Sequence, residues 1–128
     1  MAKKRSMDTI QKKDAKASFI VGLGASAGGL EALQQFFQQM PANSGLSFVV
    51  IQHLSPDYKS LMADILGKYT EMDVRQAENE MAVEPNTVYL IPPKKNLTLK
   101  NGKLMLTEYI HGTLNHPIDV FFASLAEE

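Results

Sequence analysis

The chain has 128 residues, of which 45% are hydrophobic, and a formal net charge of −1. This length and this hydrophobic content are enough for one domain with a hydrophobic core. The sequence contains no cysteine, which excludes disulfides, thiolate metal sites and a cysteine nucleophile. No apolar run reaches the roughly 20 residues that span a bilayer, and the polar N-terminus lacks the apolar region of a signal peptide. We therefore expect a cytoplasmic protein without membrane insertion.

The charge is distributed unevenly. Residues 1–17 hold six of the 13 Lys and Arg residues and two of the 14 Asp and Glu residues. Seven basic and twelve acidic residues are left for residues 18–128, a net charge of −5. We interpret residues 1–17 as a disordered basic linker, with a nucleic-acid-binding arm as the alternative. The acidic remainder argues against a surface that follows nucleic-acid phosphates, so no nucleic-acid partner is predicted.

Two apolar segments with a helical pattern between them open the domain. Residues 18–23 (SFIVGL) and 47–52 (SFVVIQ) are typical of buried parallel strands. Between them, an apolar stripe that ends at Pro41 predicts a helix, formed by Leu30, Leu33, Phe36, Phe37 and Met40. This order predicts a right-handed βαβ unit with parallel strands.

A second helical stripe follows, formed by Leu61, Met62, Ile65, Leu66 and Tyr69. Residues 73–77 and 87–91 are predicted strands. Residues 96–100 and 103–108 flank Asn101-Gly102, a strong hairpin signal because both central residues of a type I′ turn need positive φ.

Pro117 is predicted to open a last helix, in which Val120, Phe121 and Leu125 share a face. The sequence ends at Glu128 within this helix, where an α/β fold would continue with a strand. An incomplete sheet leaves a strand edge and an apolar helix face uncovered, which predicts marginal stability or self-association.

The stretch IVGLGASAGGLEAL, residues 20–33, contains a glycine-rich turn between the first strand and the first helix. In a dinucleotide fingerprint, Gly-x-Gly-x-x-Gly, the first two glycines would be Gly22 and Gly24. The third glycine position would be Ala27, a residue that the fingerprint tolerates. However, the second strand ends in Gln52-His53, without the acid that holds a ribose. No Lys-Ser/Thr pair follows the glycines, so a Walker motif is also missing. Nucleotide binding is the less favoured alternative.

Residues 24–28 (GASAG) match Gly-x-Ser-x-Gly in the strand–turn–helix setting that this motif requires. Such a turn exposes the Ser26 hydroxyl, and the backbone N–H of Ala27 at the start of the helix is suited to stabilise an oxyanion. The alternative is a turn that serves only helix–strand packing.

His53 follows the second strand as Ser26 follows the first. The carboxyl ends of parallel strands share one edge, and neighbouring strands are about 4.8 Å apart. A serine nucleophile and a histidine general base are therefore predicted within hydrogen-bond reach. A capping or packing histidine is the alternative.

With these residues, the chain resembles the catalytic domain of the chemotaxis protein-glutamate methylesterase family, from about Phe19 onward. The matching segments are IVGLGASAGGLEAL, FVVIQHLSPDY, VYLIPPKKNLTL and HPIDVFFASLA. The resemblance implies a doubly wound, three-layer α/β/α fold of the Rossmann-like type, with a mostly parallel sheet and a β-hairpin. Residues 18–128 would form the N-terminal portion of this domain. It also implies hydrolysis of γ-glutamyl methyl esters, and deamidation of glutamines in some members, on the cytoplasmic helices of chemoreceptors during signal adaptation.

In that family the nucleophile corresponds to Ser26 and the base to His53, and Ala27 stands where threonine is common. The family's triad acid lies in a later loop, beyond Glu128, so the resemblance leaves its identity open. Asp119 matches a non-catalytic position. We interpret the remaining candidate carboxylates as solvated or capping groups: Asp57, Asp64 and Asp73.

The resemblance implies no metal and no organic cofactor. His111 and His116 lie near a predicted loop without a carboxylate cluster, which argues against a metal site. Asn115 and His116 are interpreted as part of a surface loop, or alternatively as the rim of a receptor-binding cleft. The phospho-receiver domain of regulated members is absent from this sequence. The chain is thus similar to the branch that is fused to a receptor methyltransferase, which makes such a domain a candidate partner. A non-catalytic docking or regulatory fragment is the alternative function.

Overall fold

The computed structural model describes residues 19–25, 29–52, 59–112 and 114–128, with the backbone alone for residues 59–61. The predicted linker at residues 1–17 lies outside the described residues. The first βαβ unit is confirmed, as strand β1 (Ile20–Ala25), helix α2 (Leu30–Gln39) and strand β2 (Ser47–Gln52). β1 and β2 are parallel, and their register runs from Ile20 opposite Ser47 to Ala25 opposite Gln52.

The main sheet has four parallel strands in the order β1-β2-β5-β3. Strand β3 is Asp73–Gln76, β5 is Thr87–Leu90, and helix α3 (Lys59–Gly67) precedes β3. Every residue of the two central strands β2 and β5 is buried. The prediction of a buried first strand was wrong in part, because β1 lies at an edge of this sheet and is mostly half-buried.

A second, antiparallel sheet has the order β4-β7-β6, with β4 Met81–Ala82, β6 Lys95–Lys100 and β7 Lys103–Glu108. The predicted hairpin between β6 and β7 is confirmed, and its turn residues have the expected positive φ, 53° at Asn101 and 77° at Gly102. Helix α4 (Pro117–Glu127) starts at the predicted proline. β4 was not predicted.

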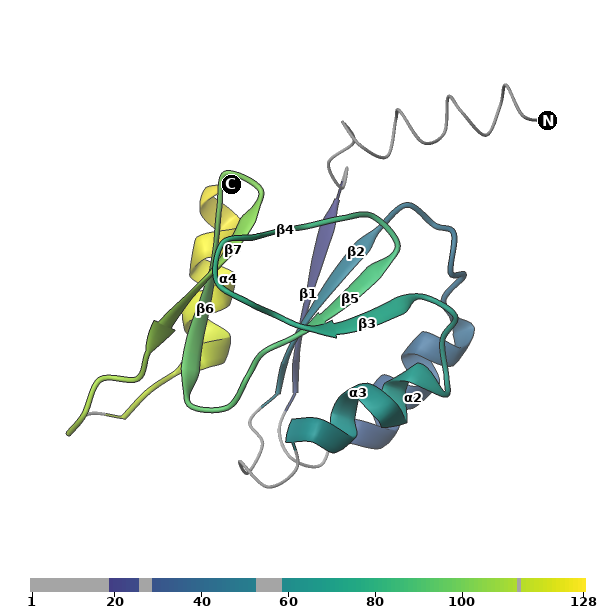
Figure 1. The fold of residues 1–128 in the computed structure, drawn as a ribbon, viewed down its shortest axis with the longest axis horizontal. Coiled ribbons are helices and arrows are strands. Elements are labelled where there is room, and N and C mark those ends of the chain that lie inside the picture. Colours follow the sequence, from purple (N-terminus) through teal and green to yellow (C-terminus); the bar gives the residue numbers. More distant parts are fainter. Residues whose placement is uncertain (1–18, 26–28, 53–58, 113) are drawn as a thin grey trace.

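The elements form layers on both faces of the main sheet (Figure 1). β2 divides its side chains between them: Phe48 and Val50 join the core with α2 and α3, whereas Val49 and Ile51 join the core with α4 and the second sheet. This alternation follows from the two-residue period of a strand. The predicted doubly wound, mostly parallel α/β fold is thereby confirmed.

The face covered by α2 and α3 is packed with aromatic rings. Leu33 and Phe37 of the predicted stripe are buried. Phe36, Phe37 and Phe48 contact one another edge to face, with ring centroids 5.2–5.7 Å apart. On α3, Met62 and Leu66 are buried, whereas Tyr69 lies beyond the end of the helix and is 38% exposed.

The opposite face depends on close approach between α4 and β1. A Cβ atom added at Gly22 would lie 2.5 Å from Cε1 of Phe122, and one at Gly24 would lie 2.8 Å from Cγ2 of Ile118. No side chain fits between these two elements, so the glycines allow α4 to pack directly on the strand. Because Ile118 meets Gly24 and Phe122 meets Gly22, α4 runs antiparallel to β1 and starts beside the strand's carboxyl end.

Candidate active site

The carboxyl ends of β1 and β2 meet at one edge of the main sheet. Ala25 and Gln52, the last residues of these strands, are register partners. In the sequence they directly precede Ser26 and His53. Ser26, Ala27 and His53 themselves lie outside the described residues, so the structure describes the strands that lead to them and not their side chains.

The chain returns sharply to β1 after the turn. Gly29 caps the start of α2, and a Cβ atom added there would lie 2.7 Å from the Cβ of Ala25. Glycine is therefore needed where the helix starts against the end of the strand. This close return fits the strand–turn–helix setting of the Gly-x-Ser-x-Gly motif.

The glycines of the alternative dinucleotide fingerprint have another explanation. Gly22 and Gly24 face Ile118 and Phe122 of α4, so their lack of a side chain serves helix packing. This contact accounts for both glycines without a bound nucleotide.

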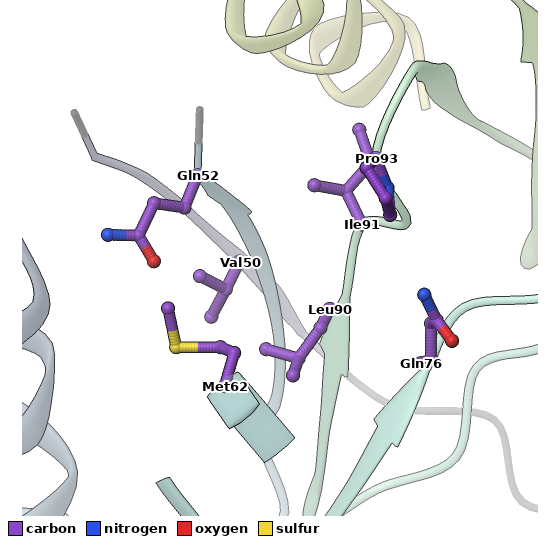
Figure 2. Close-up of a pocket in the computed structure, with 7 residues that line it drawn as sticks. All are labelled: Val50, Gln52, Met62, Gln76, Leu90, Ile91 and Pro93. Carbon is purple, nitrogen blue, oxygen red and sulfur yellow. The ribbon is translucent and has the colours of Figure 1, made fainter. Parts of the chain in front are cut away.

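A small cavity lies below the edge, between the sheet and α3 (Figure 2). It encloses about 20 Å³ and is lined by Val50, Gln52, Met62, Gln76, Leu90, Ile91 and Pro93. Figure 2 shows the amide of Gln52 above Met62, on the same side of β2 as Val50. This volume holds about one water molecule.

A larger, mostly apolar hollow of about 440 Å³ lies beside the turn, on the α2 side of β1. Its lining consists of Leu23, Gly24, Ala25, Gly29, Ala32, Leu33 and Phe36. The described residues that line the hollow on this side are thus mostly apolar.

The carboxylates singled out in the sequence are solvated wherever the structure describes them. Asp64 and Asp119 are exposed, and Asp119 lies in the first turn of α4. Asp73 begins β3, at the opposite edge of the sheet, and its Oδ2 is 2.9 Å from Nη2 of Arg75. Asp57 lies outside the described residues. The interpretation of Asp64 and Asp73 as solvated groups is confirmed.

Arg75 also pairs with Glu84, whose Oε2 is 2.7 Å from Nη1. Hydrogen bonds to Glu84 and Asp73 raise the pKa of the Arg75 guanidinium, so it stays charged. This network ties β3 to the segment before β5, far from the candidate site.

His111 and His116 are exposed in the connection between β7 and α4, as predicted for a surface loop. Within residues 19–25, 29–52, 59–112 and 114–128, no group of three or more His, Asp or Glu side chains is arranged to hold a metal ion. Asn115 holds the loop together through two hydrogen bonds to the backbone of Ile110. None of the helices in the described part of the chain is long and apolar enough to cross a membrane.

Comparisons with known proteins agree with this architecture. A relative from Desulfitobacterium hafniense, named protein-glutamate methylesterase/protein-glutamine glutaminase, is 32% identical over 133 residues, covering 99% of this chain and 34% of its own length. A Shewanella sp. (strain MR-4) relative, protein-glutamate methylesterase/protein-glutamine glutaminase 2, is 36% identical over 113 residues, or 84% of this chain and 32% of its own length. The chain thus spans about a third of the length of these curated relatives.

A solved structure shows the same fold. The crystal structure of the Thermotoga maritima CheB methylesterase catalytic domain matches with a TM-score of 0.71 and 30% sequence identity, covering 84% of this chain and 60% of that one. The sequence model of the CheB methylesterase family matches residues 21–128. The strand–turn–helix and the paired carboxyl ends of β1 and β2 agree with these matches. We conclude that the chain belongs to the CheB methylesterase family.

Proposed function

We propose that the chain is part of a serine hydrolase that demethylates γ-glutamyl methyl esters, and deamidates glutamines, on chemoreceptors. The names of its relatives, protein-glutamate methylesterase/protein-glutamine glutaminase, support this reaction class. The observation that carries the proposal is the register pair of Ala25 and Gln52, because Ser26 and His53 each follow one member of that pair. Chemistry in open α/β sheets is typically located at this edge.

In this proposal Ser26 Oγ attacks the γ-carbonyl carbon of the ester while His53 accepts the hydroxyl proton. The backbone N–H of Ala27 donates to the oxyanion of the tetrahedral intermediate. The C–O bond to the methoxy group breaks, and His53 returns the proton so that methanol leaves. Water then attacks the acyl-enzyme by the same route and releases the γ-carboxylate and free Ser26. No cofactor takes part in these steps.

The alternative is a docking or regulatory fragment that binds its partner without turnover. The chain spans 60% of the crystallised catalytic domain and about a third of the curated relatives. The resemblance assigns the triad acid to a position after Glu128. A triad without its acid loses orders of magnitude in rate.

We further propose that the partners are the cytoplasmic helices of a methylated chemoreceptor and a receptor methyltransferase domain, which places the chain in the cytoplasm. Residues 1–17 serve as the linker, and residues 18–128 form the N-terminal portion of the catalytic domain. Self-association stays a prediction: β1 is an edge strand, and Phe19 beside it is 70% exposed.

The test is methanol release from a recombinant chemoreceptor cytoplasmic fragment methylated in vitro, together with labelling by a fluorophosphonate, which reacts with activated serines. Ser26→Ala is expected to abolish both signals, and His53→Gln to lower the rate at least about 10³-fold. Ser44→Ala is the matched control, because Ser44 is exposed and only its Oγ contact with the N–H of Leu46 is affected. It should behave like the parent chain.

Because the resemblance assigns the triad acid to a position after Glu128, the same assays are made on a chain extended through the segment that follows. An extended chain that folds but neither releases methanol nor reacts with the fluorophosphonate would exclude the hydrolase. Retained binding to the receptor fragment would then support the docking alternative.

A further inference from the structure

The turn between β6 and β7 joins an asparagine directly to a glycine. Asn101 is exposed, and the backbone of Asn101 and Gly102 has positive φ. Asparagine is a thermolabile residue, because its side-chain amide can react with the backbone nitrogen of the residue that follows. Glycine has no Cβ atom that would obstruct the approach to this nitrogen. The tip of the hairpin therefore combines the residue pair and the solvent access that this reaction needs.

The hydrogen bonds of the turn do not occupy the reacting groups. The carbonyl of Gly102 accepts from the N–H of Val83 at 3.0 Å. Within the residues that the structure describes, the N–H of Gly102 and the side-chain amide of Asn101 form no hydrogen bond. Asn79 is also exposed but differs, because its Oδ1 accepts from the N–H of Leu106 at 2.9 Å. Asn101 thus has a free amide beside a free glycine nitrogen.

The same turn contacts the C-terminal end of α4, which lies beside it in Figure 1. Oε1 of Glu128 accepts from the backbone N–H of Asn101 at 2.8 Å, and Oγ of Ser124 accepts from the N–H of Leu99 at 3.0 Å. The last turn of α4 has no basic residue, and it ends in Glu127. Negative charge at a helix C-terminus is unfavourable with the helix dipole. A further negative charge at Asn101 would therefore meet an end of α4 that is already acidic.

We propose that Asn101 is a site of spontaneous deamidation, and that the carboxylate formed there loosens the C-terminal end of α4 from the hairpin. This inference does not depend on the proposed function. The backbone nitrogen of Gly102 bonds to Cγ of Asn101, and the bond from Cγ to Nδ2 breaks. Ammonia leaves with the proton that the glycine nitrogen has lost.

Water then opens the cyclic imide at one of its two carbonyl carbons. Attack at Cγ restores the ordinary backbone and leaves an aspartate at position 101. Attack at the main-chain carbonyl carbon leaves an isoaspartate, in which the backbone passes through the former side chain. Both products carry one carboxylate where the asparagine was neutral.

The new carboxylate acts on the contact with Glu128. Glu128 binds the N–H of the residue that becomes charged, so two like charges are held at one contact. Lys100 and Lys103 flank the turn and offset only part of this repulsion. Isoaspartate also adds a carbon to the backbone between these two register partners, which does not fit a two-residue type I′ turn. Either product therefore weakens the attachment of α4 to β6.

The first experiment follows the reaction in the folded chain. The protein is incubated at mildly alkaline pH, and peptide mapping by mass spectrometry detects the exchange of an NH₂ group for OH, with isoaspartate as a separately eluting peptide. Asn101 should be converted at least about tenfold faster than Asn79, which is followed by Glu80 rather than by glycine. Equal rates at the two asparagines would overturn the modification site.

The second experiment tests the effect of the charge. Asn101→Asp reproduces one product, and hydrogen exchange of the backbone amides in the last turn of α4 reports how firmly the helix end is held. The variant should exchange there about twofold faster, as expected for like charges in contact. With Glu128→Gln in the same chain, Asn101→Asp should have little effect, because the repulsion has lost one partner. Asn79→Asp is the matched control, since it adds the same charge beside β7 and keeps the oxygen that accepts from Leu106.

Exchange in α4 that is unchanged by Asn101→Asp would contradict the loosening, as would an equal increase with and without Glu128→Gln. An increase of the same size in Asn79→Asp would also contradict it, because the effect would then not be local. Thermal melts confirm that each variant is folded, which is expected because both asparagines are exposed.

Discussion

The two faces of the main sheet are built in different ways. The face under α2 and α3 is filled by side chains from elements that mostly follow one another in the chain, and its centre is the cluster of Phe36, Phe37 and Phe48. The other face closes by bringing α4 onto β1, so that Phe122 meets Gly22, a residue 100 positions earlier. The first face depends on large side chains and the second on their absence at two positions. The periodicity of apolar residues in the sequence predicts packing by large side chains, but it does not predict packing that depends on glycines.

The largest expected effect compares the central phenylalanine of each face. Phe37 is 1% exposed and Phe121 is 0% exposed, so Phe37→Ala and Phe121→Ala should each lower the free energy of unfolding by about 3–5 kcal/mol in urea titrations. Hydrogen exchange should separate the two variants. Phe121→Ala should speed exchange in α4 before α2, whereas Phe37→Ala should do the reverse.

Phe19→Ala controls for the loss of an aromatic ring and should stay within about 0.5 kcal/mol of the parent. If both core variants accelerate exchange uniformly in α2 and α4, the two faces unfold as one unit and the contrast between them is wrong.

A smaller effect is expected at the glycine contact. Gly22→Ala places a Cβ atom 2.5 Å from Phe122 and 3.2 Å from Phe121, and should cost about 1–3 kcal/mol. Because Phe122 is 37% exposed, its removal should relieve the clash without opening a deep cavity. Gly22→Ala combined with Phe122→Ala should therefore be less destabilised than the sum of the single variants, by at least about 0.5 kcal/mol in a double-mutant cycle.

Gly67→Ala is the matched control, because Gly67 ends α3 and has no atom within 4 Å of an added Cβ. It should leave stability unchanged or raise it slightly. Additive losses in the Gly22–Phe122 cycle would contradict close packing of α4 on β1.

The smallest effect concerns a buried phenol on the α4 face. Tyr89 OH accepts from the N–H of Glu84 at 2.8 Å and donates to the carbonyl of Ala82 at 3.4 Å. Tyr89→Phe should cost about 1 kcal/mol at pH 7, since it leaves these backbone groups without their partner. Burial raises the pKa of Tyr89 above its ordinary value of 10.0.

The raised pKa of Tyr89 makes the free energy of unfolding depend on pH. A pKa that is higher in the folded than in the unfolded state gives a stabilisation that is complete below pH 10 and is lost as the pH rises further. The stability difference between the parent and Tyr89→Phe should therefore shrink above pH 10 in urea titrations. A constant difference between pH 7 and 11 would argue against a perturbed Tyr89.

Most elements could be predicted from the sequence because their signals are local. The stripe of α2, the Asn101-Gly102 turn and the proline that opens α4 each depend on a few neighbouring residues. β4 could not be predicted, since two residues carry no periodicity and Met81–Ala82 is a strand only through its pairing with β7. The first strand starts two residues later than predicted, at Ile20, because strand ends depend on the partner strand.

For the candidate site, the order of elements was sufficient to predict that the carboxyl ends of β1 and β2 share an edge. The side chains of Ser26 and His53 stay predictions. The exposure of Ile110 and Leu114 could not be predicted, because apolar residues usually indicate burial and their hydrogen-bonded loop is defined by Asn115, beyond both of them. Loop conformation depends on such individual contacts rather than on a repeating pattern.

On the outer side of β6, the C-terminal part of the chain accepts hydrogen bonds from backbone donors of the hairpin. Ser124 Oγ accepts from the N–H of Leu99 at 3.0 Å, and Oε1 of Glu128 accepts from the N–H of Asn101 at 2.8 Å. These amides would otherwise be free to bind the backbone of a neighbouring molecule. With α4 docked, these two donors are occupied, which disfavours the addition of a strand at this border of the hairpin for as long as the helix stays in place. Conditions that detach α4 should thus promote aggregation before the central strands unfold.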